Sequence, residues 1–417
     1  MKDLNLLEEV VLDQLNNFLK KNPGMERMID FDKYLKTKQI VVISGIRRCG
    51  KSTLLKQLSL RLKDFYYINF EDERLLDFNL EDFNNLLVVW KKNFNSKNIL
   101  MDEIQNVDNW ELFVARLREE GYKVFITGSN SKLLSSELAT RLTGRYFLIK
   151  LYPFSFKEFL SLKKINYDIL TSDIKAKILK LFDKYLFSGG FPDYIMYQDD
   201  EFLESTYRDI IYKDIVARFK IREIKRFRQF TNFLFTNFAR EVNYNGIAEA
   251  LKIKSANSVI NYIGALEESY LIFELFKYDY SEKEHYKGNK KIYVIDNGMR
   301  KKIAFSFSED RGRFLENMVF IELKRRRKEI FYFKNEGECD FVINEKSKIV
   351  NAIQVCSNLN AYNEQREING LIEAMNKFNL KKGYILTENQ EEKKLIDGMK
   401  VNILPVWKFC LNDFDEL

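Results

Sequence analysis

The sequence has little histidine, cysteine or proline. Its 417 residues include one histidine, four cysteines and four prolines. The histidine, His285, stands in the polar stretch SEKEHYKGNK, where we expect a solvated side chain, which argues against histidine-centred triads and histidine-rich metal sites. The cysteines show no CxxC spacing, which argues against a zinc site and a disulfide framework and fits a reducing cytoplasm; they are Cys49, Cys339, Cys356 and Cys410.

Long apolar runs and a strong charge imbalance are also lacking. No uninterrupted apolar run approaches the roughly 20 residues of a membrane span. The N-terminal MKDLNLLEEVVLDQ carries acids within its apolar pattern, unlike a signal peptide. We therefore expect a cytoplasmic protein without membrane contact. The 68 basic and 61 acidic side chains give a net charge of +7, which permits a polyanionic partner without requiring one.

The first motif in the sequence is a glycine-containing loop between an expected strand and an expected helix. The segment GIRRCGKST follows the β-branched run KQIVVIS and precedes leucines at helical spacing. In a GxxxxGK[ST] loop, glycines let backbone N–H groups turn toward phosphates, and the helix N-terminus adds its positive dipole end. Lys51 would reach the β and γ phosphates of ATP, and Ser52 would hold Mg²⁺; a plain glycine turn is the alternative. The expected nucleotide-binding residues are Gly45, Arg48, Cys49, Gly50, Lys51, Ser52 and Thr53.

Two acids follow a second apolar strand. In NILMDEIQNV, three apolar residues lead directly to Asp102 and Glu103. Asp102 is expected to order Mg²⁺ through water, and Glu103 to polarise the water that attacks the phosphate. The alternative is that the acid pair caps a helix.

Polar and basic residues surround the next two strands. The run YKVFITGSNSKLL ends in a polar tip at Thr127, Ser129 and Asn130, and a side chain there can detect the γ-phosphate. The sequence does not choose between Ser129 and Asn130. Arg141 and Arg145 precede a further strand, and an arginine here can stabilise charge on a phosphoryl group bound by a neighbouring subunit. We assign this role to Arg145, with Arg141 and an ordinary surface arginine as alternatives.

The motifs GIRRCGKS, ILMDE, ITGSNS and LTGR make residues 38 to about 155 resemble the nucleotide-binding core of an AAA-type ATPase. The whole chain resembles prokaryotic, especially archaeal, AAA ATPases close to the signal-transduction ATPases. These carry a winged helix and a restriction-endonuclease-like C-terminal domain, and the pair Arg47-Arg48 is typical of them. The resemblance implies an α/β fold with a parallel P-loop sheet, ATP or ADP with Mg²⁺ as cofactors, and a homo-oligomer. It implies an ATPase core at 1–154, a helical lid or connector at 155–225, a winged helix at 226–285 and a nuclease-like domain at 286–417.

The same resemblance gives a role to FSGGFPDYI. In isolation its glycines and proline mark a turn between helices. In the signal-transduction ATPases a glycine-proline element of the lid contacts the nucleotide and reports its state. Carried over to this chain, the resemblance makes Gly190 and Pro192 nucleotide-binding residues, with a plain helix breaker as the alternative.

Two segments in the middle of the chain suit nucleic acid. Residues 217–230, ARFKIREIKRFRQF, hold six basic side chains that either bind phosphates or form a solvated helix face. The following NYNGIAEALKIKSANSVINYIGALEESYLI has a helix-turn-helix pattern, with one helix to about Leu251 and Ser255 capping the next. The second helix would bury Val259, Ile263 and Leu266 and present Asn257 and Asn261, with Lys254 near its start. That face suits DNA, and a protein-binding adaptor is the alternative. The runs YLIFELFKYDY and NKKIYVIDNG would form the wing strands.

The last third has the element order of a restriction-endonuclease-like core: helix, three strands, helix, strand. Glu316 and Asp340 stand where such nucleases have metal-binding acids. Where they have an acid and a lysine on the third strand, this chain has Gln354 and Cys356, which weakens both metal binding and water activation. We therefore expect a non-cleaving descendant of this fold. The alternative for the acids is pairing with the basic run 324–328.

The leading hypothesis is a Mg²⁺-dependent ATPase that couples its nucleotide state to movement of the winged-helix and nuclease-like domains while engaging DNA. A second is a slowly hydrolysing nucleotide switch that acts as a scaffold for protein partners. A third is an ATP-driven DNA nuclease.

Overall fold

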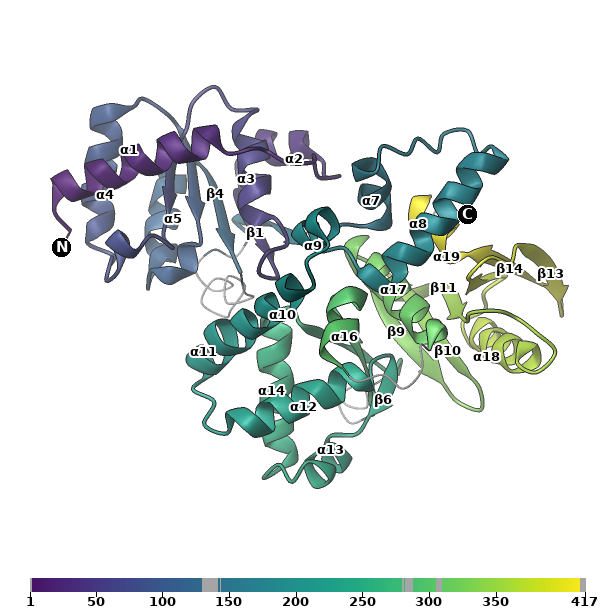
Figure 1. Cartoon of the computed structure of the whole chain (residues 1–417). Helices are drawn as coiled ribbons and strands as arrows, with labels where there is room; N and C mark the ends of the chain where they lie inside the picture. The colour runs from purple at the N-terminus through teal and green to yellow at the C-terminus, as the bar shows by residue number, and fades with distance from the viewer. Residues whose placement is uncertain are drawn as a thin grey trace. The chain divides into compact units, whose positions relative to one another are not determined.

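The computed structural model describes residues 2–129, 142, 144–279, 281, 288–304 and 310–412. The chain forms two compact units, Met1–Tyr152 and Pro153–Leu417. Among the described residues, the first unit is built on a five-stranded sheet, and the second holds a three-stranded and a six-stranded sheet (Figure 1). The fold is thus of the mixed α/β class, as the sequence predicts. None of the described helices is both long enough and apolar enough to cross a bilayer.

The first unit is an open parallel sheet. Its strand order is β2-β3-β4-β1-β5, and every neighbouring pair is parallel. Most of its strand residues are buried, as in parallel sheets covered on both faces by helices. The strands are β1 (Ile40–Gly45), β2 (Tyr66–Asn69), β3 (Asn98–Asp102), β4 (Lys123–Gly128) and β5 (Tyr146–Leu151).

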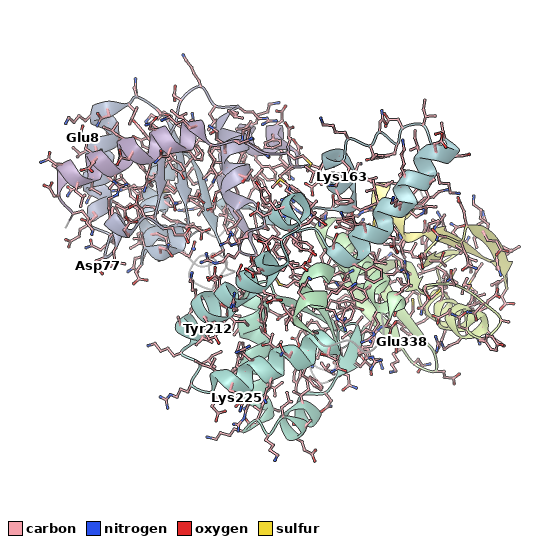
Figure 2. All side chains as sticks on the ribbon, in the orientation of Figure 1. Glu8, Asp77, Lys163, Tyr212, Lys225 and Glu338 are labelled. Carbon is pink, nitrogen blue, oxygen red and sulfur yellow. The ribbon has the colours of Figure 1, made fainter. Side chains whose placement is uncertain are left out.

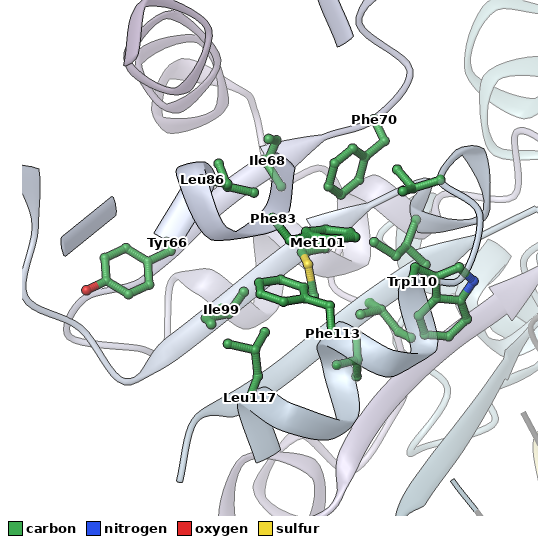
Figure 3. Close-up of a cluster of buried hydrophobic side chains, with 14 of the residues drawn as sticks. Tyr66, Ile68, Phe70, Phe83, Leu86, Ile99, Met101, Trp110, Phe113 and Leu117 are labelled. Atoms are coloured by element: carbon green, nitrogen blue, oxygen red, sulfur yellow. The ribbon is translucent and has the colours of Figure 1, made fainter. Parts of the chain in front are cut away.

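Alternate strand residues of this sheet face opposite sides. Ile99 and Met101 of β3 belong to a core with α4 and α5 (Figure 3), whereas Leu100 between them lies outside that cluster although it is fully buried. Phe83 and Phe113 stack at a centroid distance of 4.1 Å between the two helices. The helices of the unit are α1 (Leu4–Lys20), α2 (Phe31–Lys36), α3 (Lys51–Ser59), α4 (Asp82–Asn93) and α5 (Trp110–Glu119), with short 3-10 turns at Glu73–Leu75 and Ile104–Asn106.

The second unit begins with a helical segment, as predicted for this part of the sequence. Ser155 starts it with a capping box, in which Ser155 and Glu158 satisfy each other's backbone N–H groups. The helices are α7 (Phe156–Leu162), α8 (Ser172–Ser188), α9 (Pro192–Tyr197), α10 (Asp200–Asp209), a π-helix at Ile210–Val216 and α11 (Ala217–Phe219).

The three-stranded sheet lies within a helix-strand-helix-helix-strand-strand segment. Its order is β6-β8-β7 with antiparallel pairing. Ser255 accepts a hydrogen bond from the N–H of Ser258 and caps α14 as expected. The sequence predicts that the winged helix ends at residue 285. The sheet extends beyond that boundary, because its strand β8 begins at Lys290. The elements are α12 (Ile224–Thr236), β6 (Arg240–Val242), α13 (Tyr244–Ala250), α14 (Ala256–Glu268), β7 (Ile272–Phe276) and β8 (Lys290–Val294).

The six-stranded sheet has the order β13-β14-β12-β11-β10-β9. The β9-β10-β11 meander is antiparallel, whereas β11, β12 and β14 run parallel. The predicted order of helix, three strands, helix and strand is present as α17 to β12, and a further hairpin and helix follow. The elements are α16 (Asn297–Ile303), α17 (Arg311–Arg325), β9 (Glu329–Lys334), β10 (Glu338–Glu345), β11 (Lys348–Val355), α18 (Glu364–Lys377), β12 (Lys382–Thr387), β13 (Glu392–Ile396), β14 (Met399–Pro405) and α19 (Val406–Leu411).

The two sheets of the second unit are joined by buried polar contacts. The Asn317 amide on α17 accepts from the N–H of Val294 at 2.9 Å and donates to the carbonyl of Val294 at 3.0 Å. The N–H of Tyr278, just after β7, donates to the carbonyl of Tyr332 on β9 at 2.7 Å. Since such contacts are costly to break when buried, the two sheets form one structural body.

We predict that Gly190→Ala destabilises the protein by at least about 2 kcal/mol. A Cβ at Gly190 would lie 2.2 Å from the carbonyl oxygen of Phe154, whose N–H also donates to the Gly190 carbonyl at 2.7 Å. The control is Gly264→Ala in α14, where a Cβ meets open space; it should raise the free energy of unfolding by up to about 1 kcal/mol. Denaturant unfolding measures both. Equal effects of the two variants would contradict the packing argument.

Candidate nucleotide site and a second carboxylate centre

The glycine loop connects the end of β1 to the start of α3. Gly50 has φ of 96°, a left-handed conformation that a residue with a side chain rarely adopts, and it precedes the first residue of the helix, Lys51. Arg48 also has positive φ, at 62°. The successive turns direct the loop over the N-terminus of α3, where free N–H groups and the helix dipole favour an anion.

Close packing against β5 determines two residues of the loop. A Cβ on Gly45 would lie 2.1 Å from the carbonyl oxygen of Leu151, so only glycine fits there. Cys49 is fully buried, and its thiol donates to the same Leu151 carbonyl over 3.4 Å. Burial raises the pKa of the Cys49 thiol, so this cysteine is an uncharged packing residue whose backbone belongs to the loop.

Lys51 and Glu103 are brought together as the sequence predicts. The Lys51 ammonium donates to the carbonyl of Ile46 within the loop at 3.2 Å. It also lies 3.8 Å from a Glu103 carboxylate oxygen, and the two side chains are only 4% and 15% exposed. The phosphate-loop lysine and the acid after β3 therefore share one small, mostly dehydrated region.

Asp102 is the most deeply buried acid of this group. Thr127 donates a short hydrogen bond to its carboxylate, and Ser52 supplies a second side-chain hydrogen bond. Burial, followed by the neighbouring Glu103, raises the pKa of Asp102, while these two hydrogen bonds oppose the rise. The predicted metal-binding pair, Ser52 and Asp102, is thus in direct contact.

Two polar residues hold the acid pair in place. The sequence places Thr127 in the polar tip without choosing it as the γ-phosphate sensor, and it does not single out Gln105. Thr127 also accepts from the backbone N–H of Glu103 at 3.0 Å, so one hydroxyl contacts both acids. Gln105 donates to the Glu103 carboxylate and approaches the Ser129 hydroxyl at 3.5 Å. Ser129 is therefore linked to Glu103 through Gln105. Asn130, the alternative to Ser129, lies outside the described residues.

Arg27 was also missed, because it precedes the first strand and carries no motif. Its guanidinium donates to the carbonyl of Cys49 at 3.0 Å and to that of Tyr152 at 2.9 Å. Its backbone N–H donates to Gln57 on α3 at 3.1 Å. Arg27 is 5% exposed, so it acts as an internal brace for the phosphate loop.

Arg145 and the phosphate loop lie at opposite ends of the strands of this sheet. It precedes β5, whose first residue pairs with Ile40 at the start of β1, whereas the loop follows the end of β1. β5 has six residues at about 3.3 Å each, so the two ends of the strand are roughly 20 Å apart. Arg145 is half exposed and pairs with Glu119 at 3.5 Å. It is therefore too far away to contact a nucleotide on its own loop. Arg141 lies outside the described residues.

Gly190 and Pro192 belong to the second unit. Gly190 donates its N–H to Asp296 at 2.7 Å, and Pro192 is the first residue of α9, where its missing N–H is tolerated. Tight packing accounts for the glycine without any ligand, and a nucleotide contact for these two residues stays a prediction.

The predicted nuclease-like residues also converge. Lys291 on β8 lies 3.0 Å from Glu316, 2.7 Å from Glu338 and 2.8 Å from Asp340, and its side chain is 4% exposed. Although burial favours the neutral amine, the carboxylates raise the pKa of Lys291 well above its ordinary value. Burial and the nearby Asp340 raise the pKa of Glu316 to about 8. Lys291 was predicted only as part of a wing strand, because nothing in its local sequence points to the acids.

Gln354 and Cys356 stand at the edge of this centre. Gln354 accepts from the N–H of Asp340 at 3.1 Å and donates to Glu367 at 2.6 Å. Burial raises the pKa of Cys356 to about 12, so it stays an uncharged thiol. The acids thus pair with Lys291. The sequence suggests the basic run 324–328 as their partner and does not single out Lys291.

We predict opposite stability effects for two acids of the first unit in metal- and nucleotide-free protein. Because the pKa of Asp102 is raised, its stability contribution is present below the unfolded pKa of about 3.9 and is lost as pH rises. Asp102→Asn should therefore raise the melting temperature at pH 7. Arg74 and Gln14 hold the pKa of Asp72 at about 2, so its contribution is lost only as pH falls; Asp72→Asn should lower the melting temperature at pH 7. Calorimetry that shows the same sign for both would contradict these environments.

Comparison with protein-family models identifies three consecutive regions. Residues 37–160 match an AAA domain, residues 179–310 match a domain of unknown function (DUF8612), and residues 311–409 match another (DUF4143). Among solved structures, the Walker-type ATPase of Pyrococcus abyssi is similar with a TM-score of 0.42 and 15% identity, over 69% of this chain and 99% of that one.

Two relatives match almost from end to end. The uncharacterised protein MJ1544 of Methanocaldococcus jannaschii is 40% identical over 97% of this chain and 95% of its own length. An uncharacterised protein of Haemophilus influenzae is 32% identical over 92% and 96%. The chain belongs to the same family as these two proteins, and its residues 37–160 match an AAA domain.

Proposed function

We propose that this chain is a cytoplasmic, Mg²⁺-dependent ATPase in which nucleotide turnover moves the second unit. The observation that carries this proposal is the contact network at the carboxyl edge of the parallel sheet. There Lys51 lies 3.8 Å from Glu103, and Thr127 contacts both Glu103 and Asp102. The described cysteines are all free and buried, which fits a reducing compartment.

The loop after β1 binds the phosphates of ATP. Its N–H groups and the N-terminus of α3 supply donors without side-chain charge, and Lys51 adds a positive charge at the β and γ phosphates. Arg27 keeps the loop in shape by holding the Cys49 carbonyl. The backbones of Gly45, Arg48, Cys49, Gly50, Ser52 and Thr53 form the rest of the cradle.

Ser52 and Asp102 suit Mg²⁺. A hydroxyl and a carboxylate in direct contact are the oxygen donors that this hard cation prefers, directly or through water. When bound, the cation neutralises charge on the β and γ phosphates. Its charge would also relieve the cost of ionising Asp102 in a buried position.

Glu103 orients and polarises the attacking water. Thr127 holds its backbone, and Gln105 connects its carboxylate to Ser129, so that Ser129 is placed to report contact with the γ-phosphate. Arg145, on the far edge of the sheet, would complete the site only across a contact between copies of the chain. The proposal therefore includes a homo-oligomer in the active state.

DNA is the proposed partner of the second unit. The order α12-β6-α13-α14-β7-β8 with sheet order β6-β8-β7 is that of a winged helix. On α14, Asn257 and Asn261 are exposed, as is Lys254 just before the helix, and such amides can pair with adenine in the major groove. Lys225 projects from the surface of α12 (Figure 2). Within the basic stretch 217–230, Arg218 already forms an ion pair with Glu268 at 2.7 Å.

A second candidate is a slowly hydrolysing nucleotide switch. The favouring observation is that Glu103 is already engaged by Gln105 and lies near Lys51. A carboxylate held this way must rotate before it can polarise a water, which would slow turnover. In this candidate the bound nucleotide itself, rather than its hydrolysis, sets the state of the second unit for a protein partner.

The test of the ATPase is phosphate release by wild type and two variants. Glu103→Gln should lower kcat by about 100-fold or more while ATP still binds, because only the polarising charge is lost. Lys51→Ala should lose ATP binding itself, measured by calorimetry, because the phosphates lose their cation. The exposed Lys63 and Glu81 offer matched controls, Lys63→Ala and Glu81→Gln, which should behave as wild type.

Two other outcomes are informative. Retained turnover in both site variants would exclude this site. Tight ATP binding with negligible turnover in wild type, restored by Gln105→Ala, would favour the switch.

DNA binding is tested by fluorescence anisotropy with duplexes of different sequence. Lys254→Ala should weaken binding of all sequences and reduce the salt dependence, whereas Asn257→Ala and Asn261→Ala should lose about 1–3 kcal/mol of preference at individual base pairs. Lys163→Ala, on the exposed end of α7 (Figure 2), is the matched control. If the three variants at Lys254, Asn257 and Asn261 bind every duplex as wild type does, α14 is not the DNA-contacting helix.

A further inference from the structure

The carboxylates of the second unit surround a single ammonium group. The Lys291 nitrogen lies between 2.7 and 3.0 Å from one oxygen each of Glu316, Glu338 and Asp340. Glu338 and Asp340 alternate on β10 and so face the same side of the strand, while Glu316 comes from the helix α17 (Figure 2 labels Glu338). Three separate elements therefore contribute to one cation-binding centre.

Neighbouring groups fix the orientation of these acids. The second Asp340 oxygen accepts from the N–H of Val355 at 2.9 Å, which leaves the first oxygen toward Lys291. The Tyr293 hydroxyl donates to the same Glu316 oxygen that Lys291 contacts, at 2.6 Å. Supporting hydrogen bonds of this kind are what orient the acids of a metal centre.

The centre opens into a cleft that could admit hydrated ions. The cleft has a volume of 890 Å³ and is lined by Lys291, all three acids and polar residues of β11 and α18. As the side chains stand, no described group of three His, Cys, Asp or Glu residues is spaced to hold a metal. The ammonium–oxygen contacts of about 2.8 Å are longer than the roughly 2.0–2.1 Å of Mg²⁺–oxygen bonds, so the acids would have to close by about 0.7 Å to bind such a cation.

We propose that the Lys291 ammonium occupies the position among Glu316, Glu338 and Asp340 that a divalent cation would otherwise take. The three acids then bind a metal ion only when this ammonium is removed. Lys291 is tethered to β8 of the three-stranded sheet, so the cation is part of the fold rather than drawn from solution. The tethered charge both excludes metal and joins the two sheets of the unit. This inference is independent of the proposed ATPase activity, which resides in the other unit.

The experiment is titration of nucleotide-free protein with Mn²⁺, followed by calorimetry and electron paramagnetic resonance. Wild type should show no site at the acids. Lys291→Met, which keeps the length of the side chain without its charge, should bind one Mn²⁺ per chain at least 100-fold more tightly than wild type does. Adding Asp340→Asn to this variant should remove the site again.

Lys290 provides the matched control. It is the adjacent, equally buried lysine, but its ammonium lies over the rings of Tyr244 and Phe276 at 4.8 and 5.8 Å. Lys290→Met removes the same charge from the same strand and should bind no more Mn²⁺ than wild type.

Stability gives a second readout in case Lys291→Met folds poorly. The buried Glu316 and Asp340 and the partly exposed Glu338 repel one another without their cation, so the melting temperature of this variant should fall and saturating Mn²⁺ should restore it. Wild type should show no such rise. The proposal is overturned if the variant neither binds Mn²⁺ nor recovers with it, or if wild type binds Mn²⁺ at these acids. Mn²⁺-dependent DNA cleavage by wild type that Lys291→Met abolishes would also overturn it, since Lys291 would then be a catalytic lysine.

Discussion

Parallel pairing of β1, β3 and β4 is the constraint on which the candidate nucleotide site depends. Because parallel strands end at the same edge, Ser44 of β1 lies beside Gly128 of β4, and Met101 of β3 beside Ile126. The glycine loop, the two acids and Thr127 therefore lie at the same end of the strands, although Gly45 and Thr127 are 82 positions apart in the sequence. Apolar packing on both faces of the sheet keeps this register, since a slip by one residue would turn every buried side chain to the other face.

The chain buries carboxylates in two different ways. Burial, followed by the neighbouring Glu103, disfavours the ionised form of Asp102, although two hydroxyl groups donate hydrogen bonds to it. Glu316 and Asp340 are buried around a lysine that the fold itself provides. An acid of the first kind is suited to respond to a ligand, because binding changes its charge balance most. Acids of the second kind are suited to hold a structure together, because their counter-ion cannot leave.

The second unit limits how the protein can transmit a nucleotide signal. Asn317 ties β8 of the three-stranded sheet to α17, and Lys291 ties β8 to Asp340 on β10 of the six-stranded sheet. Breaking these contacts would leave buried charges and amides without partners, at a cost of several kcal/mol. In the proposed function, a signal from ATP would therefore move the three-stranded and six-stranded sheets together. This is simpler than the coupling expected from the sequence, in which these two parts were separate domains.

The amino-acid sequence by itself determined the glycine loop between strand and helix, the acid pair after an apolar strand, and the order of elements from α17 to β12. These depend on residues adjacent in the chain, such as the glycines before Lys51 and the apolar run before Asp102, so local patterns suffice. Only the tertiary structure decided the roles of Arg27, Thr127 and Lys291. Each acts on groups at least 22 residues away in the sequence. These partners meet only because folding brings distant segments together, and burial makes an unmatched charge there costly.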